Sequence, residues 1–200
     1  MPKAVGRPNM SAAEVARFRA TVGAHALAIY RADGFDKLSM RRLAKEIGCS
    51  ATTLYAHFNG KIDILMQLWA DVLDELVAKV QDAQDDCASA AAQLTQASQA
   101  FVAYWVNEPE HFRLVFMSND VTRADVEGFV TQPHAQSLLQ TFSVLVAGTG
   151  EQDVKRRTET LLVGLLGVCL CHNTLRGHDW TSSQQMVAHL VQGVLIQARK

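Results

Sequence analysis

The spacing of apolar residues is the feature that most constrains the fold, because apolar positions recur every three to four residues along almost the whole chain. In the stretch 61–84 they are Ile62, Leu65, Trp69, Val72, Leu76 and Val80. This spacing produces one apolar face on a helix, whereas a half-buried strand alternates with a period of two. No sustained alternation of period two is present, and two of the four prolines lie within the first eight residues. We therefore expect an all-α fold of about nine helices.

Residues that start and stop helices divide the N-terminal part. Ser11 and Glu14 have the spacing of a capping box, in which each side chain bonds a backbone amide at the helix start. Gly34 is expected to end that helix in the left-handed conformation. Ser39 and Ser50 are expected to cap two short helices, at about 40–47 and 51–57.

The two short helices flank the tripeptide Gly48-Cys49-Ser50, which is the layout of a helix-turn-helix. In that motif the first helix braces the second, and the second lies in the major groove of DNA. Residues of the second helix are small or polar, so they can approach base edges or phosphates. On spacing alone, a helical hairpin with incidental polar residues remains an alternative.

The distribution of charge favours a polyanionic partner for the N-terminal part. Residues 1–61 contain ten Lys and Arg against four acidic residues, a net charge of +6. Residues 62–200 contain nine basic and sixteen acidic residues, a net charge of −7. Such asymmetry is expected when only one part of a chain meets nucleic acid, although chance variation of surface charge produces it too.

The segment from Leu38 to Leu65, LSMRRLAKEIGCSATTLYAHFNGKIDIL, resembles the DNA-binding segment of the TetR family of regulators. The pentapeptide LYAHF followed by Lys61 is especially similar, and the resemblance extends over about residues 12–70. It implies a helix-turn-helix DNA-binding domain at 1–60, with the motif at about 39–58. It also implies a helical domain at 61–200 that binds a small effector and forms a homodimer.

The resemblance also implies which residues meet DNA. These are Ser39, Arg41, Arg42, Ser50, Ala51, Thr52, Thr53, Tyr55, His57 and Lys61. Tyr55, His57 and Lys61 are expected to hold phosphates, and Thr52 and Thr53 to meet bases. Many relatives carry Gly or Lys near positions 51 and 52, so the base specificity does not transfer. Arg7 could enter a minor groove, although an unstructured N-terminal arm is the simpler interpretation.

The remaining helices supply candidates for a pocket and for an interface between two copies. The pocket candidates are Phe101, Tyr104, Trp105, Phe112, Phe116, Phe142, Cys169 and His172, for which ordinary core packing is the alternative. The resemblance implies a dimer interface on the last two helices, where the candidates are Leu162, Leu165, Leu166, Met186, Leu190, Gly193 and Val194. Cys169, Cys171 and His172 do not share one helix face, so we expect no metal site and no cofactor.

The sequence therefore predicts a ligand-responsive repressor that binds a palindromic operator in double-stranded DNA as a dimer and is released by a small, largely apolar effector. An activator or a ligand-independent regulator of the same fold remains an alternative. A helical enzyme is less well supported, because no nucleophile–base signature or phosphate-binding loop is present. The longest apolar run, at 161–171, is shorter than the roughly 20 residues of a membrane helix. We expect a cytoplasmic protein.

Overall fold

The structure is a computed structural model that describes residues 10–84, 89–118, 121–150 and 152–196. Within these ranges the secondary structure is helical throughout, which confirms the all-α prediction, and it comprises ten α-helices and a short 3-10 helix, η1. Their bounds are α1 (Ala12–Asp33), η1 (Phe35–Lys37), α2 (Met40–Ile47), α3 (Ala51–Tyr55), α4 (Lys61–Asp82), α5 (Ala90–Asn107), α6 (Pro109–Phe116), α7 (Arg123–Val130), α8 (Pro133–Gly148), α9 (Val154–Thr174) and α10 (Ser183–Ile196).

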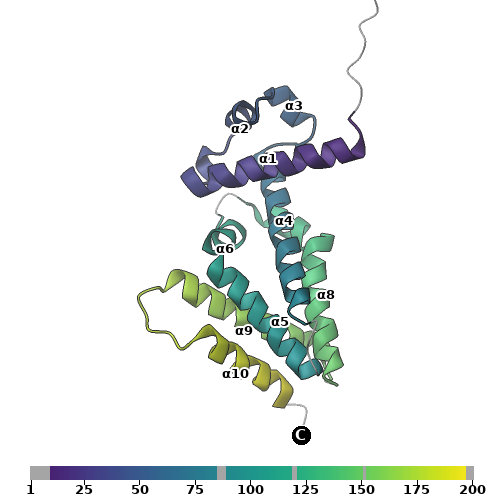
Figure 1. The fold of residues 1–200 in the computed structure, drawn as a ribbon, viewed down its shortest axis with the longest axis vertical. Helices are drawn as coiled ribbons and strands as arrows, with labels where there is room; N and C mark the ends of the chain where they lie inside the picture. Colours follow the sequence, from purple (N-terminus) through teal and green to yellow (C-terminus); the bar gives the residue numbers. More distant parts are fainter. Residues whose placement is uncertain (1–9, 85–88, 119–120, 151, 197–200) are drawn as a thin grey trace, which may run out of the picture. The chain divides into compact units, whose positions relative to one another are not determined.

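The chain forms two compact units, residues 1–68 and 69–200, and the boundary between them falls inside α4. In the first unit, α2 and α3 lie on the same side of α1 (Figure 1). Side chains from all of these helices and the first turns of α4 form its core. They include Val22, Ala26, Ile29, Phe35, Leu43, Leu54, Phe58 and Leu65, each less than 7% exposed.

The helix starts in this unit follow from local side-chain chemistry. Ser11 and Glu14 form the predicted capping box. The hydroxyls of Ser39 and Ser50 accept hydrogen bonds from the backbone amides of Arg42 and Thr53, at 3.2 Å and 3.0 Å. Each bond satisfies an amide that a helix leaves unpaired at its first turn, so the predicted start of all three helices is confirmed.

Two glycines end helices in different conformations. Gly48 has φ 79° and ψ 29°, the left-handed conformation expected at the end of α2. Gly34 ends α1 as predicted, but its φ of 79° comes with a ψ of 172°, so the expectation of a left-handed residue there was wrong. That region is accessible essentially only to glycine, and it directs the chain into η1 instead of a tight helical cap.

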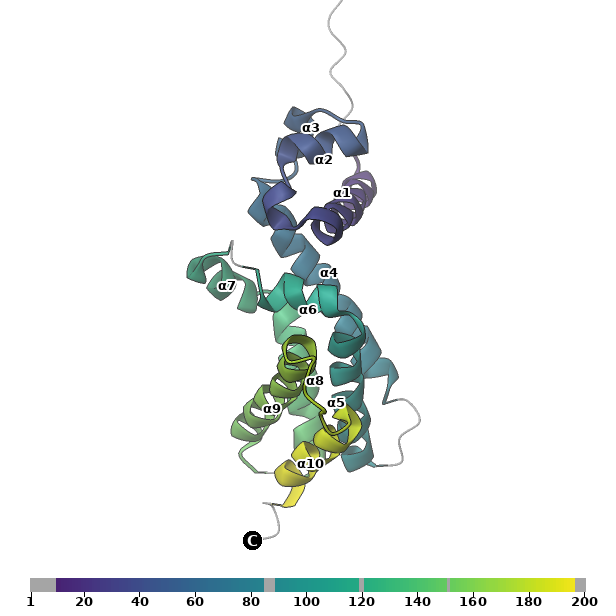
Figure 2. The same ribbon diagram turned by 90° about the vertical axis from the view of Figure 1, so that its left-hand side faces the viewer.

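In the second unit, α5 packs against α6, α8, α9 and α10 (Figure 2). Pro109 is the first residue of α6, where its missing amide costs no helical hydrogen bond. α9 and α10 approach closely, since a Cβ added at Gly164 would lie 2.9 Å from a methyl carbon of Leu190. Over the described part of the chain, no helix is both long and apolar enough to cross a membrane.

Candidate nucleic-acid interface and apolar cavity

The recognition-helix candidate α3 has one buried residue and two well-exposed ones. Leu54 is fully buried and anchors the helix, whereas Thr52 is exposed and Tyr55 is 58% exposed. The hydroxyls of Ser50 and Thr53 lie 2.8 Å apart in a hydrogen bond, in addition to the capping bond that Ser50 makes. Ser50 and Thr53 therefore hold the start of α3, while Thr52 and Tyr55 present hydroxyls to the surroundings.

The end of α3 is held by Arg19, a residue of α1 that the sequence did not identify. Its Nη1 donates to the backbone carbonyl of His57 at 2.7 Å, and its Nη2 donates to Oε1 of Gln67 on α4 at 3.1 Å. The guanidinium also lies 4.3 Å from the centroid of the Phe58 ring. The only signal in the sequence was its place beside Phe18 at the edge of the apolar face of α1.

The two arginines of α2 differ in whether they form ion pairs with other described residues of the unit. Arg42 is bound within the unit, with Nη2 2.6 Å from Asp33 and Nε 3.1 Å from Glu46. The hydrogen bond to Asp33, helped by the bond to Glu46, raises the pKa of Arg42 above its ordinary value. Arg41, which directly precedes Arg42 on α2, is exposed. Arg42 is thus held in an intramolecular network, which makes Arg41 the better candidate for DNA.

His57 and Lys61 are half-buried against aromatic rings. The His57 ring lies 4.9 Å from the Phe18 ring, centroid to centroid, and Lys61 Nζ lies 4.2 Å from the centroid of Phe35. Both side chains therefore contribute packing within the unit besides any contact with a phosphate. Arg7 lies outside the described residues.

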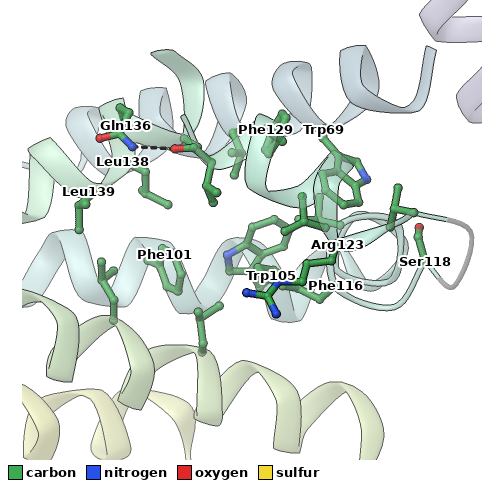
Figure 3. A pocket seen from close by; sticks show the side chains of 18 of the residues that line it. Trp69, Phe101, Trp105, Phe116, Ser118, Arg123, Phe129, Gln136, Leu138 and Leu139 are labelled. Carbon is green, nitrogen blue, oxygen red and sulfur yellow. Dashed lines mark hydrogen bonds between the residues drawn. The ribbon is translucent and has the colours of Figure 1, made fainter. Parts of the chain in front are cut away.

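The second unit contains an apolar cavity of about 710 Å³ bounded by α4 to α9 (Figure 3). Its size lies within the range of small-molecule sites. Aromatic and aliphatic side chains form most of the wall, with a few polar ones among them. The lining residues are Trp69, Leu73, Phe101, Trp105, Val115, Phe116, Ser118, Val121, Thr122, Arg123, Val126, Phe129, Val130, Ala135, Gln136, Leu138, Leu139, Leu162 and Leu166.

Three of the predicted pocket residues, Phe101, Trp105 and Phe116, line this cavity, and the other five do not. Tyr104 points instead to His111, with its hydroxyl 2.8 Å from Nδ1. Adjacent residues on a helix point about 100° apart, so Tyr104 and Trp105 cannot both face one cavity from the same side.

Phe112, Phe142, Cys169 and His172 belong to the surrounding packing rather than to the cavity wall. Phe112 and Phe142 are buried against other aromatic rings, and the His172 ring lies 6.4 Å from that of Trp180. Burial raises the pKa of the Cys169 thiol to about 12, so this group stays protonated near neutral pH. Among the described residues, no three His, Cys, Asp or Glu side chains are grouped as metal ligands would be.

The cavity wall also includes residues for which the sequence predicts core packing or no particular role. Trp69 was placed on the inward stripe of α4, and Phe129 on α7 was not singled out; the two rings meet edge to face at 5.2 Å. The periodicity of α4 identified Trp69 as inward but could not distinguish a packed core from a cavity wall, because both are apolar.

The interface candidates on α9 need revision. Leu165 is fully buried within its own chain, and Leu162 and Leu166 line the cavity, so none of the three forms the outer face of α9. The exposed apolar residues of that helix are Val163 and Leu170, at 70% and 48% exposed.

On α10, Met186 and Leu190 are half-buried, Gly193 is exposed and Val194 is buried. A groove of about 430 Å³ between α9 and α10 contains Leu190, Gly193 and Val194. The α10 candidates thus border the surface, with Val194 at the floor of the groove.

Residues 24–68 match the sequence profile of the bacterial regulatory proteins of the tetR family. The HTH-type transcriptional activator FasR of Mycolicibacterium smegmatis is 24% identical over 135 residues, which cover 68% of this chain and 61% of that protein.

Two solved structures show the same fold over nearly the whole chain. A bacterial regulatory protein in the tetR family from Rhodococcus RHA1 has a TM-score of 0.63 at 16% identity, covering 94% of this chain and 98% of its own. The fatty acid degradation regulator FadR from Bacillus halodurans has a TM-score of 0.69 at 15% identity, covering 90% and 96%.

A capped helix-turn-helix in one helical unit, followed by a helical unit with an apolar cavity, defines a class of transcription regulators rather than of enzymes. Within that class, the DNA-binding segment at residues 24–68 is of the TetR family, and the fold of the chain is shared with solved regulators of that family.

Proposed function

We propose that the protein binds a pseudo-palindromic operator as a homodimer, with α3 of each protomer in a major groove. The observation that supports this proposal most strongly is the presentation of α3: Thr52 and Tyr55 are exposed on a helix that Ser50 holds at its start and Arg19 at its end. A recognition helix must be held in a fixed position if its contacts are to discriminate between DNA sequences.

The contacts divide by chemistry. Ala51 and Thr52 meet base edges, where the threonine methyl and hydroxyl suit thymine and adenine. Tyr55, His57 and Lys61, together with Ser39 and Arg41, hold phosphates and set the register of the helix. Arg42, Ser50 and Thr53 act through the structure instead, because their polar atoms bond within the unit.

Two copies associate through the outer faces of α9 and α10. Val163 and Leu170 are exposed on α9, and the groove that contains Leu190 and Gly193 is bounded by the first turns of the same helix. Two helices from each protomer form a four-helix bundle in that arrangement, and its twofold symmetry matches the two half-sites of a palindrome.

The cavity of the second unit holds a small, largely apolar effector. Trp69 and Leu73 on its wall belong to α4, whose earlier turns belong to the first unit. An effector that favours one position of α4 shifts the protein toward a state with lower DNA affinity, by as much as its affinity differs between the two states. The protein then acts as a repressor that its effector releases.

Retention on DNA tests the core of this proposal. A duplex selected from random sequence should remain bound at ~150 mM salt, where non-specific binding has weakened steeply. Equal retention of selected and scrambled duplexes at that salt would contradict sequence-specific binding. Thr52→Ala should relax the selected sequence at one or two positions, at a cost of about 1–3 kcal/mol there.

Activation of transcription is the second candidate, since the FasR relative is described as a transcriptional activator. Transcripts of genes next to the selected operator distinguish the two in a strain that lacks the protein. A rise supports repression, whereas a fall supports activation.

A further inference from the structure

The indole nitrogen of Trp105 is buried and has no hydrogen-bond partner within the described residues. The other two indole nitrogens are bonded: Trp69 Nε1 donates to the carbonyl of Leu114 at 2.8 Å, and Trp180 Nε1 donates to that of Leu175 at 3.1 Å. Leaving a buried donor unsatisfied destabilises a protein appreciably, so each instance calls for an explanation.

Trp105 lies on the wall of the apolar cavity. Its side chain is held by the rings of Phe101 and Phe116 at 6.3 Å and 5.1 Å, which fix the orientation of the indole. Figure 3 shows the nitrogen-bearing edge of Trp105 turned toward the side of the cavity where Phe101 and Leu138 lie. The nitrogen itself has almost no accessible surface, so a bound molecule reaches this donor when a neighbouring side chain of the wall shifts slightly.

Two polar donors elsewhere on the wall, the hydroxyl of Ser118 and the amide nitrogen of Gln136, already bond within the protein. Ser118 Oγ donates to the carbonyl of Leu114 at 2.6 Å, and Gln136 Nε2 donates to that of Val130 at 2.6 Å. Arg123 is the one lining residue with a formal charge; its side chain is 91% exposed, and Nε lies 2.6 Å from Glu127. Among the described lining residues, Trp105 Nε1 is thus the one buried donor without a protein partner, and the one charged side chain is exposed and paired with Glu127.

We propose that the effector is a neutral, mainly apolar molecule with one carbonyl or ether oxygen that accepts a hydrogen bond from Trp105 Nε1. This inference rests on the proposed function, in which the cavity is the effector site. Burying the acceptor against this donor supplies the hydrogen bond that Trp105 Nε1 lacks within the described residues, while the rest of the molecule displaces water from apolar surface.

Three probes that each join two phenyl rings through one carbon test the inference: benzophenone, with a carbonyl; diphenylmethane, without an acceptor; and diphenylacetate, which adds a carboxylate and its negative charge. Calorimetric titration of the full chain should show benzophenone binding about fivefold more tightly than diphenylmethane, the net effect of one hydrogen bond. Diphenylacetate should bind no more tightly than diphenylmethane. Tightest binding by diphenylacetate would overturn the neutral assignment.

Trp105→Phe removes the N–H and keeps an aromatic ring, so it should abolish the preference for benzophenone. Trp69→Phe is the matched control, because Trp69 lines the same cavity with its N–H already bonded to Leu114. That variant should keep the preference. An unchanged preference in Trp105→Phe, or a loss in both variants alike, would overturn the role of Trp105.

A measurement on the unsubstituted protein covers the case in which Trp105→Phe fails to fold. In protein labelled with ¹⁵N, benzophenone should shift one indole N–H resonance downfield, and diphenylmethane should leave it in place; equal shifts would contradict the hydrogen bond. Affinity for the selected DNA, measured in parallel, reports separately on the proposed function. If a probe binds in a way that depends on Trp105 but does not change the affinity for DNA, the proposed release from DNA by an effector is contradicted. The assignment of Trp105 Nε1 as the hydrogen-bond donor then still holds.

Discussion

Arg19 is the residue on which the geometry of the first unit depends most, since one side chain connects α1 to the end of α3 and to α4. Its guanidinium bonds the His57 carbonyl and Gln67 and packs on Phe58. Because α3 has only five residues, its own hydrogen bonds cannot fix its direction, and the bond at its end contributes that constraint.

Replacing Arg19 should therefore weaken DNA binding without removing a DNA contact. We expect Arg19→Met to lower the opening free energy of the α3 amides by about 2 kcal/mol, the usual cost of a lost hydrogen bond to a charged group. Native-state hydrogen exchange measures this change. Arg17→Met, an exposed residue on the same helix, is the control and should change little. Equal effects of the two variants would contradict the role of Arg19.

Cys169 should be inert in the folded protein. Its side chain is fully buried and its pKa is raised to about 12, whereas alkylation requires an accessible thiolate. At pH 8, mass-spectrometric mapping after iodoacetamide treatment should find Cys49 modified before Cys169. Addition of urea should then expose Cys169. Comparable rates at the two cysteines in native buffer would show that α9 is not packed as described.

At the scale of elements, the turn between α2 and α3 depends on Gly48. Its φ is positive, and a Cβ added there would meet nothing within 4 Å, so a substitution acts through backbone strain alone. We expect Gly48→Ala to destabilise the first unit by about 1–2 kcal/mol.

Gly60→Ala is the matched control for this prediction, because Gly60 has equally open surroundings and no positive φ. Urea unfolding followed by circular dichroism should show a shift for Gly48→Ala and little for Gly60→Ala. If the two variants unfold at the same urea concentration, an alanine at position 48 adopts the left-handed conformation without loss of stability. The turn then does not depend on a glycine at that position.

Helix starts were predictable because they depend on residues within one turn. Ser11, Ser39 and Ser50 cap the helices at which the sequence places them, and Pro109 begins α6. The conformation of Gly34 was not predictable in the same way, because it depends on the chain that follows. That chain folds into η1, which requires a ψ at Gly34 outside the helical region.

The walls of the site were less predictable, because they depend on which side of each helix faces which neighbour. Trp105 faces the cavity, while the adjacent Tyr104 bonds His111. The α9 candidates show the same limit: composition identifies leucines, but only the packing of α9 on α5, α8 and α10 separates buried Leu165 from exposed Val163.

At the scale of the whole molecule, dimerisation is the property that joins two half-sites. A carboxylate on the outer face of α9 should separate the protomers, because an unpaired charge in an interface is costly. Leu170→Asp should therefore sediment as a monomer and lose about tenfold or more in operator affinity.

Met117→Asp is the control for this prediction, since Met117 at the end of α6 is 47% exposed and Leu170 is 48% exposed. It should remain dimeric in sedimentation velocity. A dimeric Leu170→Asp would place the interface on another face of the second unit.

The central claim is that α3 reads a palindromic operator, and a nuclease footprint on the selected duplex tests it most directly. The wild-type protein should protect two half-sites one helical turn apart or a multiple of it. Thr52→Ala combined with Tyr55→Phe should abolish protection at the concentration that saturates the wild type, with the fold intact by circular dichroism. Protection that survives this double substitution, or a footprint without twofold symmetry, would contradict the account.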